Sequence, residues 1–128
     1  MLAYVTVGTN DVAAAAAFYD AALAPLGFVR GFSTESEVGY GPAGGKTRFY
    51  VMTPFDRRPA TVGNGVDIAF EAPSRAAVDA FFAAAMAQGG TDEGGPGLRL
   101  NYGPNFYTAY VRDRDGNKLN AVFNEPVV

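Results

Sequence analysis

Apolar and polar positions follow a strand period, then a helix period, then a strand period again, and the whole cycle occurs twice. Residues 2–8 alternate between apolar and polar types, which predicts a strand buried on one face. Asn10 or Asp11 can cap the helix that follows. Pro25 and Gly27 are expected to end this helix. Three short strands are predicted next, at 28–32, 37–41 and 46–53.

The second half restarts the cycle with a strand at 66–71. Ser74 is the natural N-cap of its helix, and the glycines at 89–90 end that helix. Residues 92–102 hold a weak strand pattern that Gly94-Gly95-Pro96-Gly97 interrupts, so this stretch is expected to be a flexible surface loop. The last two strands are predicted at 106–112 and 118–123, joined by a turn whose Asp-Gly pair favours a hairpin.

A shift of the sequence by about half its length aligns the two halves. Strand falls on strand, Phe18 falls on Phe81, and Gly27 falls on Gly90. This is the pattern of a duplicated module that cannot close a core alone. We therefore expect an α+β fold in which two βαβββ modules stand in tandem and a curved mixed sheet encloses a cleft. The expected single domain covers 1–128, with module 1 at 1–54, a linker at 55–64 and module 2 at 65–128.

The alternation also assigns a face to each strand residue. Apolar residues that are expected to lie under the helices are Val5, Val7, Phe49, Val51, Ile68, Phe70, Leu119 and Phe123. The opposite face mixes aromatic and polar groups. Two curved half-sheets that face each other would line a cleft with it, and such clefts are where small ligands bind.

Composition narrows the class of partner. The chain has 128 residues, a net charge of −3, 48% hydrophobic residues and no cysteine. The charge gives no basic face for a nucleic acid, and no apolar run is long enough to span a membrane. We expect a cytoplasmic protein whose partners are a small molecule or a second copy of the chain.

Several segments carry a family resemblance that covers nearly the whole chain. They are residues 65–70, 72–81, 94–99 and 107–122, the last including Val111-Arg112-Asp113-Arg114-Asp115-Gly116-Asn117. Together they resemble the glyoxalase/bleomycin-resistance/extradiol-dioxygenase superfamily, also called vicinal oxygen chelate proteins. The resemblance implies the same duplicated βαβββ fold and a homodimer.

The resemblance also implies a divalent metal. In such proteins a histidine on the first strand of each module and a carboxylate or histidine on the last strand hold the ion. The matching positions here are Tyr4 and Asp67 on the first strands, Asn120 and either Arg48 or Tyr50 on the last strands, and Gly103 where small bacterial relatives often carry a further histidine.

The donors that such a metal needs are missing. The chain has no histidine and no cysteine, which leaves Asp67 as the plausible ligand among these positions. One carboxylate with a phenol and an amide is a poor site, and Arg48 would repel the cation. We therefore expect no metal and no other cofactor.

Two interpretations stand for each candidate residue. Asp67 can be a general base, with Tyr4 or Tyr50 as proton donor, or it can be paired with Arg48 or a tyrosine without chemistry. Arg48 can clamp a ligand carboxylate or phosphate, or it can face water. The aromatic residues can stack on a flat ligand or serve as ordinary packing. The predicted ligand-binding set is Tyr4, Arg48, Tyr50, Asp67, Tyr102, Phe106 and Asn120, of which Asp67 and Tyr4 are the catalytic candidates.

The leading hypothesis is a protein with a degenerate metal site that binds a small anionic or aromatic molecule in the cleft, for sequestration as resistance proteins do. A second hypothesis is an enzyme: a metal-independent lyase or isomerase, or a residual metal-dependent glyoxalase or dioxygenase, acting on a small carbonyl or aromatic compound. A third is a scaffold whose cleft is filled by its own side chains. The sequence leaves open the ligand and whether modules pair within or between chains.

Overall fold

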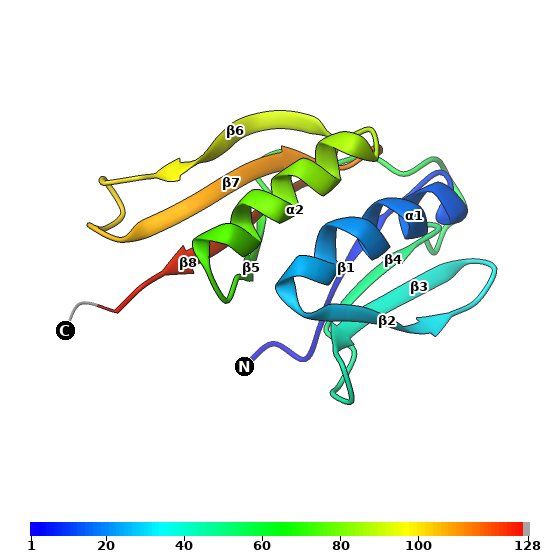
Figure 1. Cartoon of the computed structure of the whole chain (residues 1–128). Helices are drawn as coiled ribbons and strands as arrows, with labels where there is room; N and C mark the ends of the chain where they lie inside the picture. The colour runs from blue at the N-terminus through cyan, green and yellow to red at the C-terminus, as the bar shows by residue number, and fades with distance from the viewer. Residues whose placement is uncertain (127–128) are drawn as a thin grey trace.

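The computed structural model describes residues 1–126, so the final residues of the predicted second module, 127–128, lie outside the described residues. Figure 1 shows the path of the chain. Its elements are β1 (Val5–Gly8), α1 (Val12–Leu23), the short 3₁₀ helix η1 (Ala24–Leu26), β2 (Phe28–Ser33), β3 (Glu37–Pro42), β4 (Phe49–Met52), β5 (Ile68–Glu71), α2 (Arg75–Ala87), β6 (Thr91–Leu98), β7 (Phe106–Arg112) and β8 (Lys118–Asn124).

Two four-stranded sheets share one topology. The first has the order β1-β4-β3-β2 and the second β5-β8-β7-β6. In each sheet the first strand of the module pairs in parallel with the last, and the other pairs are antiparallel. The predicted duplication of a βαβββ module in an α+β fold is confirmed. The sheets stay separate and do not close into one, so a single enclosing sheet does not form within the chain.

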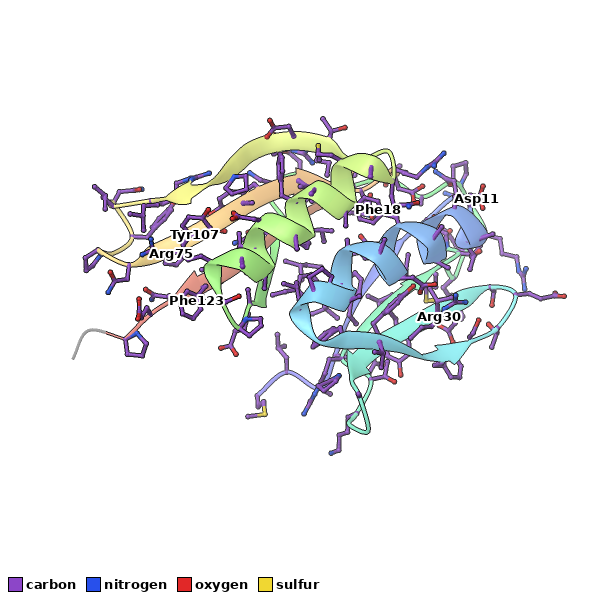
Figure 2. All side chains as sticks on the ribbon, viewed as in Figure 1. Asp11, Phe18, Arg30, Arg75, Tyr107 and Phe123 are labelled. Carbon is purple, nitrogen blue, oxygen red and sulfur yellow. The ribbon has the colours of Figure 1, made fainter. Side chains whose placement is uncertain are left out.

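The two helices, one from each module, pack against each other where the modules meet. Helices α1 and α2 lie side by side and contact each other, each against its own sheet (Figure 1). Phe18 and Phe81, the aromatic pair of the repeat, are fully buried. Phe18 reaches the end of α2, close to Gly90 (Figure 2). Within residues 1–126, no helix is long and apolar enough to cross a bilayer.

Both helices begin as the sequence predicts. The Asp11 carboxylate accepts from the backbone N–H of Ala14 at 3.0 Å, and the Ser74 hydroxyl accepts from that of Ala77 at 3.0 Å. Each cap satisfies a backbone donor that the first helical turn leaves without a partner. Gly27 follows η1 with a φ of 84°, a left-handed conformation that ends the first helix.

The predicted faces of the strands are confirmed under the helices. Phe49, Val51, Phe70 and Leu119 are buried, and Val5, Val7, Ile68 and Phe123 pack partly buried against the same core. Because alternate residues point to opposite faces, this burial leaves the other face of each sheet open.

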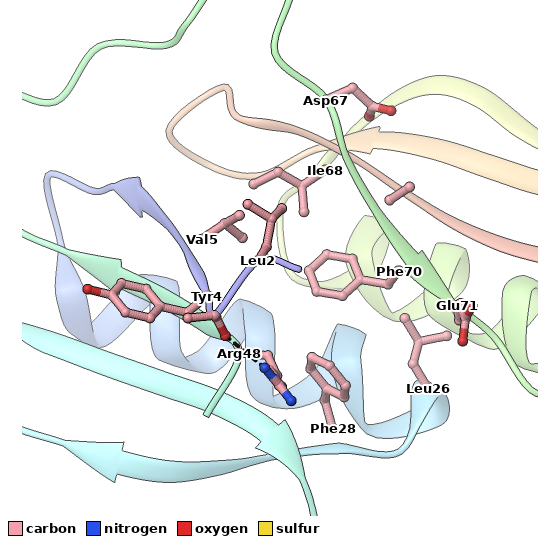
Figure 3. Close-up of a pocket in the computed structure, with 12 residues that line it drawn as sticks. Leu2, Tyr4, Val5, Leu26, Phe28, Arg48, Asp67, Ile68, Phe70 and Glu71 are labelled. Carbon is pink, nitrogen blue, oxygen red and sulfur yellow. Dashed lines mark hydrogen bonds between the residues drawn. The ribbon is translucent and has the colours of Figure 1, made fainter. Parts of the chain in front are cut away.

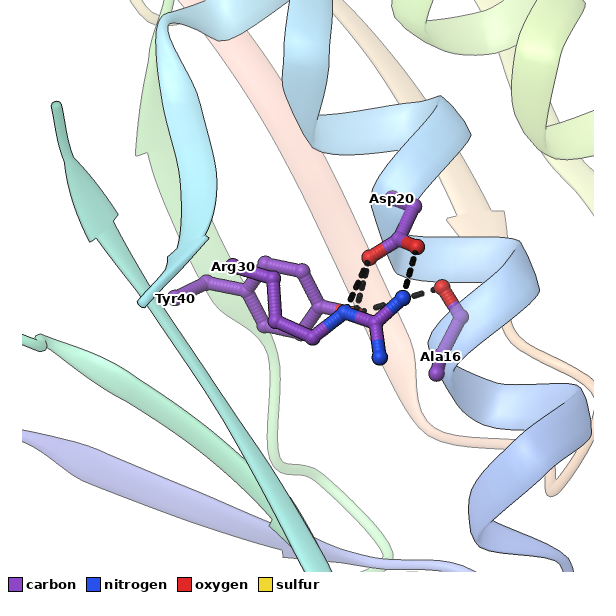
Figure 4. A network of polar contacts seen from close by, with 4 residues as sticks. All are labelled: Ala16, Asp20, Arg30 and Tyr40. Atoms are coloured by element: carbon purple, nitrogen blue, oxygen red, sulfur yellow. Dashed lines mark hydrogen bonds and ion pairs between the residues drawn. The ribbon is translucent and has the colours of Figure 1, made fainter. Parts of the chain in front are cut away.

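A polar network fixes α1 on the first sheet (Figure 4). Arg30 donates to both carboxylate oxygens of Asp20, at 2.5 Å and 3.1 Å. The hydroxyl of the buried Tyr40 donates to Asp20 at 2.8 Å, and burial raises the Tyr40 pKa. All of these groups partner one another, so the network is a structural contact between helix and sheet.

The expectation of a loop over residues 92–102 is wrong for residues 92–98, which belong to β6. Gly94 and Gly97 lie inside β6, opposite Tyr110 and Thr108 of β7, with shifts in register on either side of Gly94. The Asp92 carboxylate accepts from the Gly94 N–H at 2.8 Å and supports the first shift. Bulges let a strand accommodate glycine, so pairing with β7 overrides the local turn preference.

Candidate functional site

A cleft opens between the first strands of the two modules. It has a volume of about 540 Å³ and lies along the edges of β1 and β5, which pair on their other sides with β4 and β8. We call it the inter-module cleft. Its lining is drawn in Figure 3 and consists of Leu2, Ala3, Tyr4, Val5, Leu26, Phe28, Arg48, Asp67, Ile68, Ala69, Phe70 and Glu71. An accessible cavity between the half-sheets argues against the scaffold hypothesis.

The walls of the inter-module cleft are mainly apolar. The rings of Phe28 and Phe70 meet edge to face with centroids 5.7 Å apart, which joins β2 to β5 at one end of the cleft. Arg48 donates from Nη1 to the carbonyl of Ala3 at 3.1 Å, which orients the guanidinium while leaving its other donors available. Figure 3 shows Arg48 and Asp67 on opposite sides of the cleft, so these two side chains do not neutralise each other.

Asp67 is held by an amide that sits beneath it. When the Asn120 side chain is oriented to satisfy both its polar atoms, Nδ2 donates to the two carboxylate oxygens of Asp67 at 2.8 Å and 3.2 Å, and Oδ1 accepts from Thr108 at 3.1 Å. Asn120 and Thr108 are buried. Partial burial raises the pKa of the Asp67 carboxyl, and the nearby positive charge of Lys118 opposes that rise. The predicted partners of Asp67, Arg48 or a tyrosine, are therefore replaced by Asn120.

Replacing Asp67 by Asn is expected to raise the melting temperature at neutral pH. Because the folded state holds the Asp67 proton more tightly than the unfolded chain, its ionised carboxylate destabilises the fold above the raised pKa, and this penalty is lost as the pH falls and the group is protonated. Thermal unfolding between about pH 4 and pH 8 should therefore show a gain for D67N that shrinks toward acid. An equal gain at both ends of this range would contradict the expectation.

A second hollow lies on the open face of the second sheet, with a volume of about 490 Å³. We call it the second-sheet hollow. Its lining includes Asp67, Glu93, Gly94, Arg99, Asn101, Tyr102, Tyr110 and Lys118. The sequence pattern did not single out Arg99, Lys118 or Glu93. A signal exists for Arg99, because Gly94, Gly95 and Gly97 shortly before it leave part of the strand without side chains.

The open face of the first sheet carries a smaller, aromatic hollow of about 290 Å³. Tyr50 is its centre: its ring lies 5.1 Å from that of Tyr4 and 6.1 Å from that of Phe32, edge to face in both cases. Such contacts are favourable packing for aromatic side chains on a half-exposed strand.

The predicted site residues are divided among these three places. Tyr4, Arg48 and Asp67 line the inter-module cleft. Tyr4 and Tyr50 line the aromatic hollow of the first sheet, and Asp67 and Tyr102 line the second-sheet hollow. The Phe106 ring lies against that of Tyr102, with centroids 5.3 Å apart, and Asn120 is buried beneath Asp67. The one cleft expected to collect all seven is therefore divided, because the sheets do not close on each other. Of the two tyrosines proposed to assist Asp67, Tyr4 shares a cleft with it.

The side chains around Asp67 do not fit a transition metal. No group of three or more His, Cys, Asp or Glu residues that could hold an ion occurs among residues 1–126. Asp67 accepts from Asn120, and the other carboxylate of the second-sheet hollow, Glu93, forms an ion pair with Arg112 at 2.5 Å. Zinc, iron and nickel favour imidazole, thiolate or several carboxylates together.

Comparison with known proteins gives a consistent result. The sequence profile of the Glyoxalase/Bleomycin resistance protein/Dioxygenase superfamily matches residues 1–121. A glyoxalase/bleomycin resistance protein from Albidiferax ferrireducens T118 is 43% identical, with a TM-score of 0.82 over 93% of this chain and 94% of that one. No curated protein matches.

More distant structures share the fold. A glyoxalase-related enzyme from Fulvimarina pelagi is 20% identical, with a TM-score of 0.74 over 97% of this chain and 88% of that one. A glyoxalase/bleomycin resistance protein/dioxygenase family enzyme from Burkholderia phytofirmans PsJN is 19% identical, with a TM-score of 0.71 over 96% of this chain and 98% of that one. At these identities the similarity shows a shared fold and does not show a shared reaction.

Proposed function

Because the chain belongs to the glyoxalase/bleomycin resistance protein/dioxygenase superfamily, we propose that it binds a small organic molecule in the inter-module cleft without the help of a transition metal. The observation that carries the proposal is the cleft itself, whose volume of about 540 Å³ falls in the range of small-molecule sites. The donor set around Asp67 supports the metal-free part, because the family's histidines are replaced by Tyr4 and Asp67.

The lining of the cleft favours a ligand with an apolar body and one negative end. Leu2, Phe28 and Phe70 offer apolar surface, and burial of such surface is favourable in proportion to the area removed from water. Arg48 supplies the positive charge, with guanidinium donors still available after its bond to Ala3. A planar guanidinium binds a carboxylate through two parallel hydrogen bonds. Sequestration of such a compound, without turnover, is the activity that we propose.

Thermal-shift measurements test this function. A panel of aromatic acids, thiol conjugates and antibiotics should contain compounds that raise the melting temperature, since a ligand at about 100 times its Kd stabilises the folded state by about 2.7 kcal/mol. For an anionic member of the panel, Arg48→Ala should weaken binding at least about tenfold, the loss of one charge-assisted contact. Arg58→Ala is the matched control, because Arg58 is exposed in the linker.

Three results would count against the proposal. Equal weakening by Arg48→Ala and Arg58→Ala would mean that the ligand does not use the cleft. Elemental analysis of the purified protein that finds one transition metal per chain, together with an activity that is lost on chelation, would overturn the metal-free part. A panel in which no compound shifts the melting temperature would remove the support for small-molecule binding.

A second candidate function is acid–base catalysis, favoured by the raised pKa of Asp67 and by the presence of Tyr4 in the same cleft. Asp67 would take a proton from the carbon next to a carbonyl group while the Tyr4 hydroxyl gives one to the carbonyl oxygen, which yields an enol. Turnover of α-ketoaldehydes or hydroxy acids that disappears in Asp67→Asn would select the enzyme over the binding protein. Ligand binding without turnover would select the binding protein.

A further inference from the structure

The glycine-rich strand β6 positions the side chain of Arg99. A Cβ placed on Gly94 would lie 3.2 Å from Nη2 of Arg99, and one placed on Gly97 would lie 3.2 Å from Nη1. The guanidinium also donates from Nη2 to the carbonyl of Gly95 at 2.9 Å. Arg99 therefore folds back over β6 and lies against its backbone, a close approach that glycine at both positions favours. The segment interpreted from sequence as a loop thus fixes the position of a cation.

A second cation approaches the same aromatic ring. The Arg99 guanidinium lies 5.9 Å from the ring centroid of Tyr110, and the Lys118 ammonium lies 5.2 Å from it. Attraction to the negative ring face holds both cations near Tyr110. Within residues 1–126, neither Arg99 nor Lys118 forms an ion pair with a carboxylate. Two positioned positive charges thus line one hollow, where the Asp67 carboxylate acts on Lys118 from beyond ion-pair distance.

Of the two carboxylates that line the hollow, one forms an ion pair with an arginine outside the lining and the other is held by a neutral amide. Glu93 is paired with Arg112, and Asp67 accepts from Asn120. The remaining surface of the second-sheet hollow includes Tyr102, whose side chain is 63% exposed. Its ring offers a flat apolar surface beside the two cations, and aromatic rings stack favourably on flat ligands.

We propose that the second-sheet hollow is an anion site that binds the carboxylate of a flat organic acid between Arg99 and Lys118, with the body of the acid against Tyr102. The site shares Asp67 with the inter-module cleft but uses other cations, Arg99 and Lys118 in place of Arg48, so the proposal does not depend on the proposed function. Asp67 also lines the hollow, close enough to Lys118 for their charges to interact. Its negative charge disfavours a second anionic group, so the site selects monoanions over dianions.

Titration of ¹⁵N-labelled protein followed by NMR tests the proposal with three probes of similar shape: benzoate, neutral benzamide and dianionic phthalate. Benzoate should move the amide signals of Gly94 and Gly97, and it should bind at least about tenfold more tightly than benzamide or phthalate, the factor that one lost charge-assisted contact costs. The Arg99→Gln, Lys118→Gln double variant should lose at least the same factor. The double variant Arg58→Gln, Lys46→Gln removes two exposed cations elsewhere and should bind like the original protein.

Several outcomes would overturn the site. They are equal binding of benzamide, unchanged affinity in the Arg99→Gln, Lys118→Gln variant, and Gly94 and Gly97 signals that benzoate leaves in place. Signals that move only at Val5 and Ala69 would assign benzoate to the inter-module cleft, which supports the proposed function and excludes this one. If the double variant shows a lowered unfolding midpoint, the single variant Lys118→Gln on the sheet face is measured in its place. It should lose less benzoate affinity than the double variant. An unchanged affinity in Lys118→Gln would count against the site.

Discussion

Replacing Gly41 by Ala is expected to lower the free energy of unfolding by about 3 kcal/mol or more. A Cβ at this position would lie 2.1 Å from the carbonyl oxygen of Lys46 and 3.1 Å from the Cα of Thr47. These are backbone atoms of the chain returning from β3 to β4, so no side-chain rotation relieves the clash. Lys46 and Thr47 would have to move away from β3, and with them the next residue, Arg48, which lines the cleft.

Urea unfolding monitored by circular dichroism measures the effect, and Gly31 supplies the control. Gly31 lies in β2, the neighbouring strand, and a Cβ there would meet nothing within 4 Å. Gly31→Ala should leave the free energy of unfolding within about 0.5 kcal/mol of the original. If both variants lost the same stability, the effect would come from glycine's backbone freedom in general and not from contact with Lys46.

The elements that the sequence predicts well are those whose signals are local and repeated. Asp11 and Ser74 begin their helices because an N-cap needs only a short polar side chain and the next turn of backbone. The strand faces follow from alternation alone, as the burial of Phe49 and Leu119 illustrates. The stretch around Gly94 fails for the opposite reason: its strand depends on a partner, β7, that lies in another part of the sequence.

The candidate site shows the same division. The inherited positions Tyr4 and Asp67 can be found by aligning the two halves, and both line the inter-module cleft. The position of the Arg99 side chain cannot be predicted this way, because it depends on the pairing of β6 with β7, which brings Tyr110 beneath the guanidinium. The separation of the open faces into distinct hollows depends on how the two sheets stand relative to each other, which no periodicity encodes.

The turn between β7 and β8 also has a role that its sequence does not reveal. Asp-Gly predicts a hairpin, and Gly116 adopts the left-handed conformation that such turns require, with φ of 92°. The structure adds that the turn contacts the first module. Asn117 donates from its side chain to the carbonyl of Gly8 at 3.0 Å, and Asp115 accepts from the backbone N–H of Asn10 at 2.9 Å. The turn therefore helps to set the position of one half against the other.

The buried carboxylate of Asp113 is the centre of this contact, and Asp113→Ala is expected to lower the free energy of unfolding by about 3 kcal/mol. Asp113 accepts four hydrogen bonds: from the Tyr19 hydroxyl at 2.5 Å, from the backbone N–H groups of Asp115 and Asn117 at 2.9 Å, and from the Asn117 side chain at 2.9 Å. Tyr19 lies in α1 and is fully buried. Without Asp113 the Tyr19 hydroxyl would lose its hydrogen-bond acceptor, and a buried donor without an acceptor lowers the stability of the fold.

A second tyrosine–aspartate pair in the same chain provides the control. Tyr107 donates to Asp79 at 2.6 Å, but Asp79 is exposed. Asp79→Ala should change the free energy of unfolding by no more than about 0.5 kcal/mol, because water replaces the lost bond. A double-mutant cycle with Tyr19→Phe and Asp113→Ala should give a coupling energy of about 1 kcal/mol or more, against little coupling for Tyr107→Phe and Asp79→Ala. Equal coupling in the two pairs would mean that burial between the modules adds nothing. A larger value for the first pair would mean that the halves of the repeat, and the cleft between them, are held together by polar contacts as well as by the apolar contact of α1 with α2.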